Sequence, residues 1–372
     1  MEVAVLSSEL SRAMHLARQI AEPISLQTTD HQLVVFSANS EAMVFCRLGA
    51  TVHKPGAIKV VARTDPTKLG RNLLLSARSG TLAISGDRET MTIPCEPLDE
   101  TPGIPEVETV ASTSLDAFLQ ALQQTLFASV ISTSSWWANV PPALRYLSFR
   151  ADNGELEIMA MDGYRLSWKK IPLLRGGKIS FLLPAHLALG LKKVVFAGPR
   201  QGEVSFAYSG NWYSIQAGGT TVFFQKDPQR SFPPIDWKYF TAGYRTSAVL
   251  SCADIKPILE VLKRLPKYHP LAKDLTAFLR FAQKSLIMIP QPPGKTVAMS
   301  LDAIVDGKGD VAFHAPFLAQ ALESFLVPGS PAERIRIEFD PNTRHRPARF
   351  SSPDDGSYIH LLMPISARFS SP

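Results

Sequence analysis

The sequence of 372 residues has few cysteines, no long apolar run and no signal peptide pattern. Cys46, Cys95 and Cys252 are far apart and odd in number, so they predict neither a disulfide framework nor a zinc site. No apolar stretch is long enough to cross a bilayer. The first residues lack the basic start and the apolar stretch of a signal peptide. We therefore expect a cytoplasmic protein without a membrane partner.

Common catalytic patterns are also missing. The histidines form no His-x3-His pair and no His-Glu-x-x-His motif, and no Gly-x-Ser-x-Gly sequence is present. Residues 293–296 resemble the end of a phosphate-binding loop, but Ile289 stands where the first glycine of that loop is required. Acidic residues show no clustered pair for metal-assisted chemistry. We therefore expect no enzyme activity, no catalytic residue, no metal site and no cofactor.

The overall composition is that of an ordinary soluble protein with an excess of positive charge. Hydrophobic residues make up 45% of the chain, and its length suits two or three domains. Lysine and arginine (39) outnumber aspartate and glutamate (33), which gives a net charge of +6. This excess permits a polyanionic partner without requiring one.

A pattern of helix, strands, helix and strands occurs three times along the chain. Amphipathic helices with apolar residues at helical spacing are predicted near residues 8–21, 115–130 and 252–265. A second type of helix is expected in each repeat, where a proline or an alanine is followed by leucines three and seven positions later. These helices are expected to begin at Pro66, Pro184 and Ala315.

Segments of alternating polarity lie between the predicted helices and indicate strands. They include residues 32–36, 81–84, 156–160, 204–208, 285–288 and 335–339. Each repeat is therefore an α+β unit with two helices on antiparallel sheets. The predicted domains are 1–109, 110–246 and 247–372.

Residues 159–168 combine an Asp-Gly pair with apolar residues that alternate on both sides. Asp162 and Gly163 therefore predict the turn of a β-hairpin. An isolated Asp-Gly turn is common in β-rich chains and indicates no function by itself. We expect the hydrophobic C-terminal stretch, residues 358–365, to lie beside this hairpin.

The order and spacing of these features resemble the bacterial β sliding clamp, the processivity subunit of DNA polymerase III. The resemblance rests on the three α+β repeats, on Asp-Gly-x-Arg-Leu at 162–166, on Phe-Pro at 232–233 and on Met-Pro at 363–364. It covers essentially the whole chain. It implies three DNA-clamp domains per chain and a head-to-tail homodimer closed into a ring around duplex DNA.

The resemblance also implies that helices lining the ring attract the DNA backbone without reading its sequence. Each basic residue taken singly fits a solvated helix face equally well. Trp137 is added because an exposed indole stacks on unpaired bases, although packing in a core near Leu144 is the other interpretation. The DNA-facing candidates are Arg12, Arg18, Lys68, Arg71, Trp137, Lys192, Lys193, Lys256, Lys263, Arg264 and Lys267. Leu265 is the candidate for the dimer seam.

A pocket between the second and third domains is the remaining implication. In the family it binds a short linear motif of the replicative polymerase, the clamp loader and repair proteins. Apolar walls with methionines suit a surface that accepts many related peptides, while a plain core between domains is the alternative interpretation. The corresponding residues are Leu144, Met161, Gly163, Tyr164, Arg165, Leu166, Pro233, Trp237, Lys238, Pro347, Leu361, Leu362, Met363, Pro364 and Ile365.

The sequence departs from the family pattern at several points. Met161 stands where threonine is usual, Trp237 stands where arginine is usual, and residues 369–372 extend past the normal end. The positive net charge contrasts with the acidic character of typical members. The alternative hypothesis is a divergent clamp-like accessory or scaffold protein of plasmid or phage type, without normal ring loading.

Overall fold

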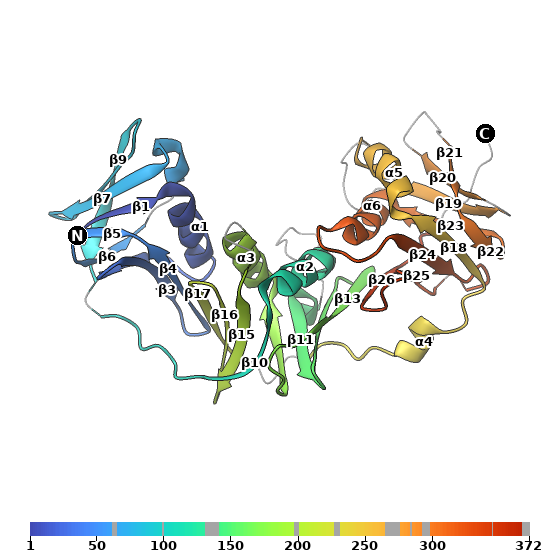
Figure 1. Ribbon diagram of the computed structural model, residues 1–372, viewed down its shortest axis with the longest axis horizontal. Helices are drawn as coiled ribbons and strands as arrows, with labels where there is room; N and C mark the ends of the chain where they lie inside the picture. The colour runs from blue at the N-terminus through green and yellow to red at the C-terminus, as the bar shows by residue number, and fades with distance from the viewer. Residues whose placement is uncertain are drawn as a thin grey trace. The chain divides into compact units, whose positions relative to one another are not determined.

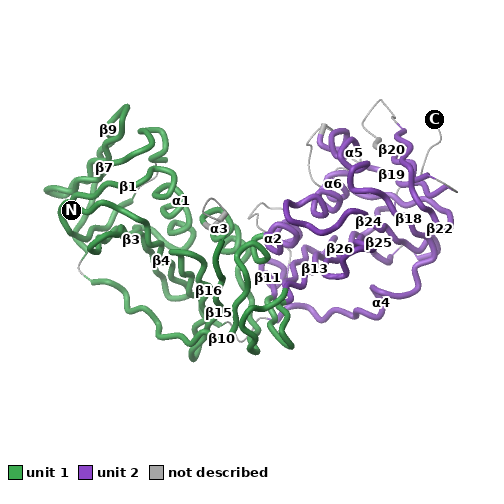
Figure 2. The backbone as a smooth tube through the Cα atoms, viewed as in Figure 1, with its two compact units in different colours: residues 1–119, 149–156, 172–230 green, residues 120–148, 157–171, 231–372 purple. Residues whose placement is uncertain are grey.

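A computed structural model describes residues 1–61, 65–98, 100–130, 141–196, 201–226, 231–264, 276–282, 285–291, 298–343 and 345–366. The chain divides into two compact units (Figure 2). Unit 1 contains residues 1–119, 149–156 and 172–230, and unit 2 contains residues 120–148, 157–171 and 231–372. Within the described ranges, no helix has the length and hydrophobicity needed to cross a bilayer.

The elements follow one another in three similar series (Figure 1). The first series is β1 (Glu2–Leu6), α1 (Ser7–Arg18), β2 (Ile24–Thr29), β3 (Gln32–Ala38), β4 (Ala42–Gly49), β5 (Thr51–Lys54), β6 (Ala57–Val60), η1 (Pro66–Leu69), β7 (Asn72–Arg78), β8 (Thr81–Ser85) and β9 (Thr90–Pro97). The second is β10 (Glu108–Ser114), α2 (Leu115–Thr125), η2 (Leu126–Ala128), η4 (Pro142–Arg145), β11 (Tyr146–Asp152), β12 (Glu155–Met161), β13 (Arg165–Pro172), β14 (Ile179–Pro184), α3 (Ala185–Phe196), β15 (Glu203–Ser209), β16 (Trp212–Ala217) and β17 (Thr220–Gln225).

The third series begins after a short helix, α4 (Trp237–Thr241). It is β18 (Thr246–Ser251), α5 (Cys252–Arg264), β19 (Thr276–Ala282), β20 (Ser285–Gln291), β21 (Met299–Asp302), β22 (Ile304–Asp306), β23 (Gly309–His314), α6 (Ala315–Glu323), η5 (Ser324–Leu326), β24 (Arg334–Phe339), β25 (Ala348–Ser351) and β26 (Tyr358–Leu362). The compact units divide the middle series between them, so the domain boundaries near 109 and 246 stay predictions.

Local chemistry sets where the helices begin and end. The Ser114 hydroxyl accepts from the Ala117 amide at 3.3 Å at the start of α2, and the Ser251 hydroxyl accepts from the Ala253 amide at 3.2 Å at the start of α5. The expected helix at Pro66 is only the 3-10 turn η1. It ends there because Gly70, at φ +145° and ψ −173°, turns the chain into an extended conformation before β7.

Unit 1 contains one continuous sheet in the order β10-β15-β16-β17-β4-β3-β2-β6-β9-β8-β7-β1-β5. Strands of the first and second series meet where β17 pairs antiparallel with β4, from Thr220 opposite Cys46 to Phe224 opposite Ala42. Helices α1 and α3 lie side by side over this sheet (Figure 1). A Cβ at Gly190 would lie 2.6 Å from Leu16 Cδ1, so a larger residue there would force the Leu16 side chain to move.

Unit 2 repeats this arrangement. Strands β12, β13, β26, β25, β24, β18 and β22 are neighbours in one sheet, and β21, β20, β19 and β23 form another. Helices α5 and α6 lie side by side (Figure 1) and close a core that includes Ile258, Leu318, Phe313 and Phe350. Strands of the second and third series meet where β13 pairs with β26.

Candidate functional site

The predicted hairpin is present, and the Asp162 side chain holds its turn. Its Oδ1 accepts hydrogen bonds from the amides of Tyr164 and Arg165, both at 3.0 Å. Gly163 has φ +91°, a conformation that favours glycine. The carboxylate therefore takes up amides that the tight turn leaves unpaired.

The C-terminal strand lies beside the hairpin, as predicted. Arg165 is opposite Leu362 and Leu166 is opposite Leu361 in the antiparallel pairing of β13 with β26. The pairing continues past the strand end, where the Met363 amide donates to the Tyr164 carbonyl at 2.8 Å. Residues nearly two hundred positions apart thus form one surface.

Alternate residues of β13 point to opposite faces of the sheet, here called the inner face and the outer face. Arg165, Ser167 and Lys169 belong to the inner face, together with the pairing partners of these residues on β26. Leu166 and Trp168 belong to the outer face. The two faces have different chemistry.

The inner face at the hairpin is dominated by the buried Arg165. Its Nε donates to Asp162 Oδ2 at 2.8 Å, and its terminal nitrogens donate to the Phe127 carbonyl at 2.6 Å and to Gln320 Oε1. The guanidinium carbon lies 4.3 Å from the centre of the Phe317 ring. Burial lowers the pKa of Arg165 and raises the pKa of Asp162, even though each charge stabilises the other. Arg165 therefore supports the hairpin from the inner face.

Further polar groups are buried along the same face. Ser167 Oγ lies 2.7 Å from His360 Nδ1, and burial holds the pKa of His360 well below its usual value. The Tyr358 hydroxyl lies 2.8 Å from Ser324 Oγ and 3.0 Å from the Gln124 carbonyl. These contacts connect β26 to the end of α2 and to η5, so they fix the pairing of β13 with β26.

The outer face is apolar at its centre. Leu166 and Leu361 lie opposite each other and are buried. The ring of Trp237, at the start of α4, lies 5.1 Å from the ring of Trp168. Asp236 caps this short helix by accepting from the Lys238 amide at 3.1 Å, while the Lys238 side chain is exposed.

The segment that carries α4 is attached to the same sheet by residues that directly precede β25. Buried Arg346 donates to the carbonyls of Gly243 at 3.0 Å, Tyr239 at 2.5 Å and Ala242. Its guanidinium carbon lies 4.1 Å from the ring centre of Tyr244, whose hydroxyl donates to the Pro347 carbonyl at 3.0 Å. The segment that presents Trp237 is therefore held on its C-terminal side.

The structure places several of the predicted pocket residues at the pairing of β13 with β26. A Cβ at Gly163 would lie 3.9 Å from Leu144 Cδ1, and Tyr164 is 41% exposed beside Phe317. Ile365 donates its amide to the Ala312 carbonyl at 2.8 Å. Met161, Pro233, Met363, Pro364 and Ile365 are half-buried. Leu362 and Arg165 differ, because both face inward, and Leu362 belongs to the main core of unit 2.

Sequence reasoning missed three residues that shape this site. Trp168, Phe317 and Arg346 contact Trp237, Arg165 and the α4 segment respectively. Trp168 could have been found from the sequence, because it stands two residues after Leu166 and such residues point to the same face of a strand. The other two carried no local pattern.

The predicted DNA-facing residues in unit 1 lie on or near helices. Arg12, Arg18, Lys192 and Lys193 are at least partly exposed on α1 and α3, and Lys68 and Arg71 are exposed in and after η1. Lys193 Nζ is 3.4 Å from His15 Nε2, and burial together with Lys193 and Arg18 lowers the pKa of His15.

In unit 2, Lys256 is exposed on α5, and Lys263 is paired with Glu323 at 2.7 Å. Trp137, Leu265, Lys267 and the side chain of Arg264 lie outside the described residues, as do residues 369–372. Among the described residues no cluster of three metal-binding side chains is found.

The full chain is similar to solved sliding-clamp structures. The DNA polymerase sliding clamp of Bacillus subtilis has a TM-score of 0.76 at 16% identity, and the DNA polymerase III β subunit of Thermotoga maritima has 0.77 at 17%. The Pseudomonas aeruginosa sliding clamp bound to griselimycin has 0.74 at 16%. Each alignment covers 99% of this chain and 100% of the other. No protein-family model and no curated protein matches the sequence. The similarity confirms the predicted α+β clamp fold.

Proposed function

We propose that this protein is a DNA sliding clamp, a non-catalytic ring that encircles duplex DNA and tethers the replicative polymerase and other clamp-binding proteins. The observation that carries the proposal is the full-length clamp fold together with two equivalent strand junctions within one chain. A ring of repeated domains needs such a junction between each pair of neighbouring domains.

The strands that remain unpaired support the proposed ring closure. β17 and β26 each close a series by pairing with β4 or β13 of the series before it. β9 and β21 occupy the corresponding places in the first and third series. Among the described strands, β21 has a neighbour only on its β20 side, and Thr90–Pro94 of β9 pairs only with β8. Pairing of β9 in one copy with β21 in a second copy would close a head-to-tail dimer.

The basic residues on α1, α3 and α5 support the DNA partner. Arg12, Lys193 and Lys256 are accessible and lie on α1 and α5, the first helices of their series, and on α3, the second helix of the middle series. Contacts of such side chains with phosphates are independent of base sequence, so the ring would slide. Lys263 contributes less, because Glu323 already neutralises it.

The outer face around Leu166 and Leu361 supports the peptide partner. Trp237 beside Trp168, and Met363 next to the end of β26, offer partly accessible apolar groups near these buried residues, which suits the apolar anchors of an extended peptide. Exposed Lys238 favours an acidic residue in that peptide. Leu362 and Arg165, both turned inward, would fix the wall without touching the ligand.

A divergent accessory or scaffold protein without normal ring loading is the second candidate, and Pro94 favours it. The Cys95 amide donates toward β8, to the Gly80 carbonyl at 2.9 Å. The neighbouring position 94 therefore faces the free edge of β9, where proline has no amide hydrogen to donate. A seam at this edge would lack one hydrogen bond that a different residue would supply.

Mass and topology test the proposal. Light scattering should give about twice the 40.8 kDa chain mass at micromolar concentration. The loaded protein should remain on nicked circular DNA and leave linear DNA rapidly. A strict monomer, or equal loss from both DNA forms, would refute encirclement and favour the scaffold hypothesis.

Peptide binding is tested separately with the double variant Trp237→Ala and Met363→Ala. Its affinity for a polymerase-derived clamp-binding peptide should fall at least about tenfold, because two accessible apolar contacts are removed. Ile304→Ala, on exposed β22, is the matched control. Unchanged affinity of a folded double variant would exclude this surface.

A further inference from the structure

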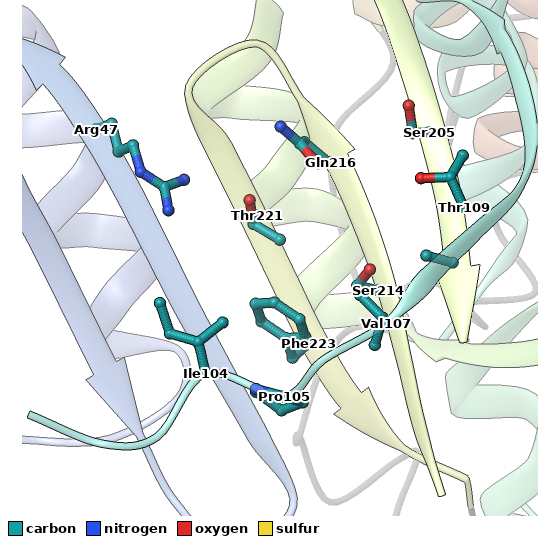
Figure 3. A pocket seen from close by; sticks show the side chains of 11 residues that line it. Arg47, Ile104, Pro105, Val107, Thr109, Ser205, Ser214, Gln216, Thr221 and Phe223 are labelled. Atoms are coloured by element: carbon teal, nitrogen blue, oxygen red, sulfur yellow. The ribbon is translucent and has the colours of Figure 1, made fainter. Parts of the chain in front are cut away.

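Unit 1 contains a depression of about 520 Å³ on the outer side of its sheet. It lies between β15, β16 and β17 and the segment that leads into β10 (Figure 3). Its volume is within the range of sites that bind small ligands or short peptides. All residues that line it belong to unit 1.

The floor and the walls of the depression differ in chemistry. Ser205, Ser214, Gln216 and Thr221 point hydroxyl and amide groups from the sheet into the space (Figure 3). The walls are apolar. They are formed by Phe223 from the sheet and by Ile104 and Pro105 from the crossing segment, and Ile104 is 49% exposed. A ligand with both polar and apolar groups matches this lining.

One charged side chain, that of Arg47, lines the depression. Its backbone is fixed, because the amide donates to the Gly219 carbonyl at 2.8 Å, while its side chain extends from β4 toward the space (Figure 3). No acidic partner of Arg47 is found among the described residues. The nearby Glu106 and Glu108 are exposed and do not line the depression. The site therefore favours an anionic ligand.

The crossing segment offers unpaired backbone groups. Residues 103–106 belong to no strand and make no backbone hydrogen bond to another described residue. Three of these four residues have an amide hydrogen, since Pro105 has none. An extended peptide laid along the segment would satisfy such groups in the manner of an added strand.

The junction of β17 with β4 and the junction of β26 with β13 are alike in what covers their outer faces. Phe223 lies opposite Met43 where β17 meets β4, as Leu361 lies opposite Leu166 where β26 meets β13. In unit 1 a connecting segment crosses that outer face, and in unit 2 Trp237 of the next connecting segment contacts it. The depression therefore occupies the same side of an equivalent junction.

We propose that this depression is a second docking site, which binds a short acidic peptide segment of a partner protein in extended form. A carboxylate of the peptide pairs with Arg47, its backbone pairs with residues 103–106, and an apolar side chain packs between Ile104 and Phe223. The site is distinct from the proposed pocket in unit 2 and does not depend on DNA encirclement.

Fluorescence anisotropy tests the site with the labelled peptide Thr-Val-Asp-Phe-Asp-Val and with a control peptide that has lysine at both aspartate positions. Only the acidic peptide should bind. Arg47→Gln should weaken binding at least about tenfold, because a charge-assisted contact is lost. Gln216→Trp should abolish binding by filling the depression from an exposed floor position. Leu174→Trp, at another exposed site in unit 1, should have no effect.

Three outcomes would overturn the proposal. The first is no binding of the acidic peptide, or binding that Arg47→Gln and Gln216→Trp leave unchanged. The second is loss of binding in the Trp237→Ala and Met363→Ala double variant alone, which would assign the peptide to unit 2. The third is complete displacement by equimolar N-acetylaspartate, which would indicate a site for small carboxylates. None of these outcomes bears on ring formation.

Discussion

Replacing Asp162 by asparagine should destabilise unit 2 by about 3–5 kcal/mol. The carboxylate is 2% exposed and its partner Arg165 is 9% exposed. Asparagine keeps an oxygen for the amides of Tyr164 and Arg165, which Asp162 Oδ1 accepts at 3.0 Å. It places an NH2 group where Oδ2 now accepts from Arg165 Nε at 2.8 Å. The guanidinium would then be buried beside a donor and without a counter-charge.

The directions of the pKa shifts explain why the cost is large. Burial is the largest influence on both groups, raising the pKa of Asp162 and lowering the pKa of Arg165. Loss of hydration therefore outweighs the mutual attraction, and the pair is not by itself a strong source of stability. Removing one partner is costly because the other stays charged in a dry site. Arg165→Met combined with Asp162→Asn should cost less than the sum of the single changes, by about 0.5–3 kcal/mol.

Urea unfolding followed by tryptophan fluorescence measures these differences in stability. Trp168 lies on β13, the strand that follows the Asp162 turn, and Trp237 contacts Trp168 on the outer face. The midpoint should shift while the dependence on urea concentration stays constant. Asp306→Asn, at an exposed position of β22, is the control and should change stability by less than about 0.5 kcal/mol. A loss below about 1 kcal/mol for Asp162→Asn, or additive single changes, would refute the buried-charge argument.

Three further predictions concern packing, pH and the buried network. Gly190→Ala should lower the melting temperature, because the new Cβ would lie 2.6 Å from Leu16 Cδ1, and overpacking costs about 1–3 kcal/mol. Burial lowers the pKa of His314 from 6.5 to about 4 and also lowers that of His360. Unfolding binds protons below pH 6.5, so stability should be complete above that pH and fall as pH decreases toward 4, by up to about 1.4 kcal/mol per pH unit for His314, with a loss in the same direction from His360. Titration of unfolding free energy checks this, and a flat profile between these limits would contradict it. Tyr358→Phe should cost about 1–3 kcal/mol in urea unfolding, because its hydroxyl partners lose a donor.

The hairpin could be predicted because turn chemistry and strand alternation are local signals, whereas its pairing with the distant C-terminal strand was an expectation that only the resemblance to the clamp family supported. Asp162-Gly163 specifies the turn, and the apolar run that ends at Leu362 needs a neighbouring strand. The role of Arg165 could not be predicted in this way. The alternation along β13 would place Leu166 and Trp168 toward a core and Arg165, Ser167 and Lys169 toward solvent, yet these three polar residues are buried. Only the positions of Phe317 and Gln320, far along the chain, show that the guanidinium faces inward.

The depression in unit 1 shows a second limit of sequence reasoning. Ser205, Ser214 and Thr221 are ordinary outward residues of strands, and Ile104 belongs to a proline-rich connection. Their relation appears only when the connection crosses the sheet. Gly190 is similar, since nothing near it in the sequence indicates that Leu16 will pack against it. Features made by contacts between distant segments lack a periodic signature.

The two strand junctions share the same antiparallel pairing, but the residues on their inner faces are apolar in unit 1 and polar in unit 2. On β4 the inner positions are Ala42, Val44 and Cys46, which face Phe224, Val222 and Thr220. The corresponding positions on β13 are Arg165, Ser167 and Lys169. Burial raises the pKa of Cys46 to about 12, so its thiol stays neutral and the unit 1 junction is held by apolar packing.

Charged and hydrogen-bonded groups hold the unit 2 junction instead. Lys169 Nζ is 2.6 Å from Ser357 Oγ and 3.4 Å from Asp355, and Arg165 contacts four other residues. A slip of one residue in β26 would separate Lys169 from Asp355 and Ser357, and Ser167 from His360, so the polar inner face favours a single register. The register in turn fixes Leu361 and Met363 on the outer face, where the proposed peptide binds. Residues such as Trp237 are then free to change partner specificity, because the contacts that align the two strands lie on the other side of the sheet.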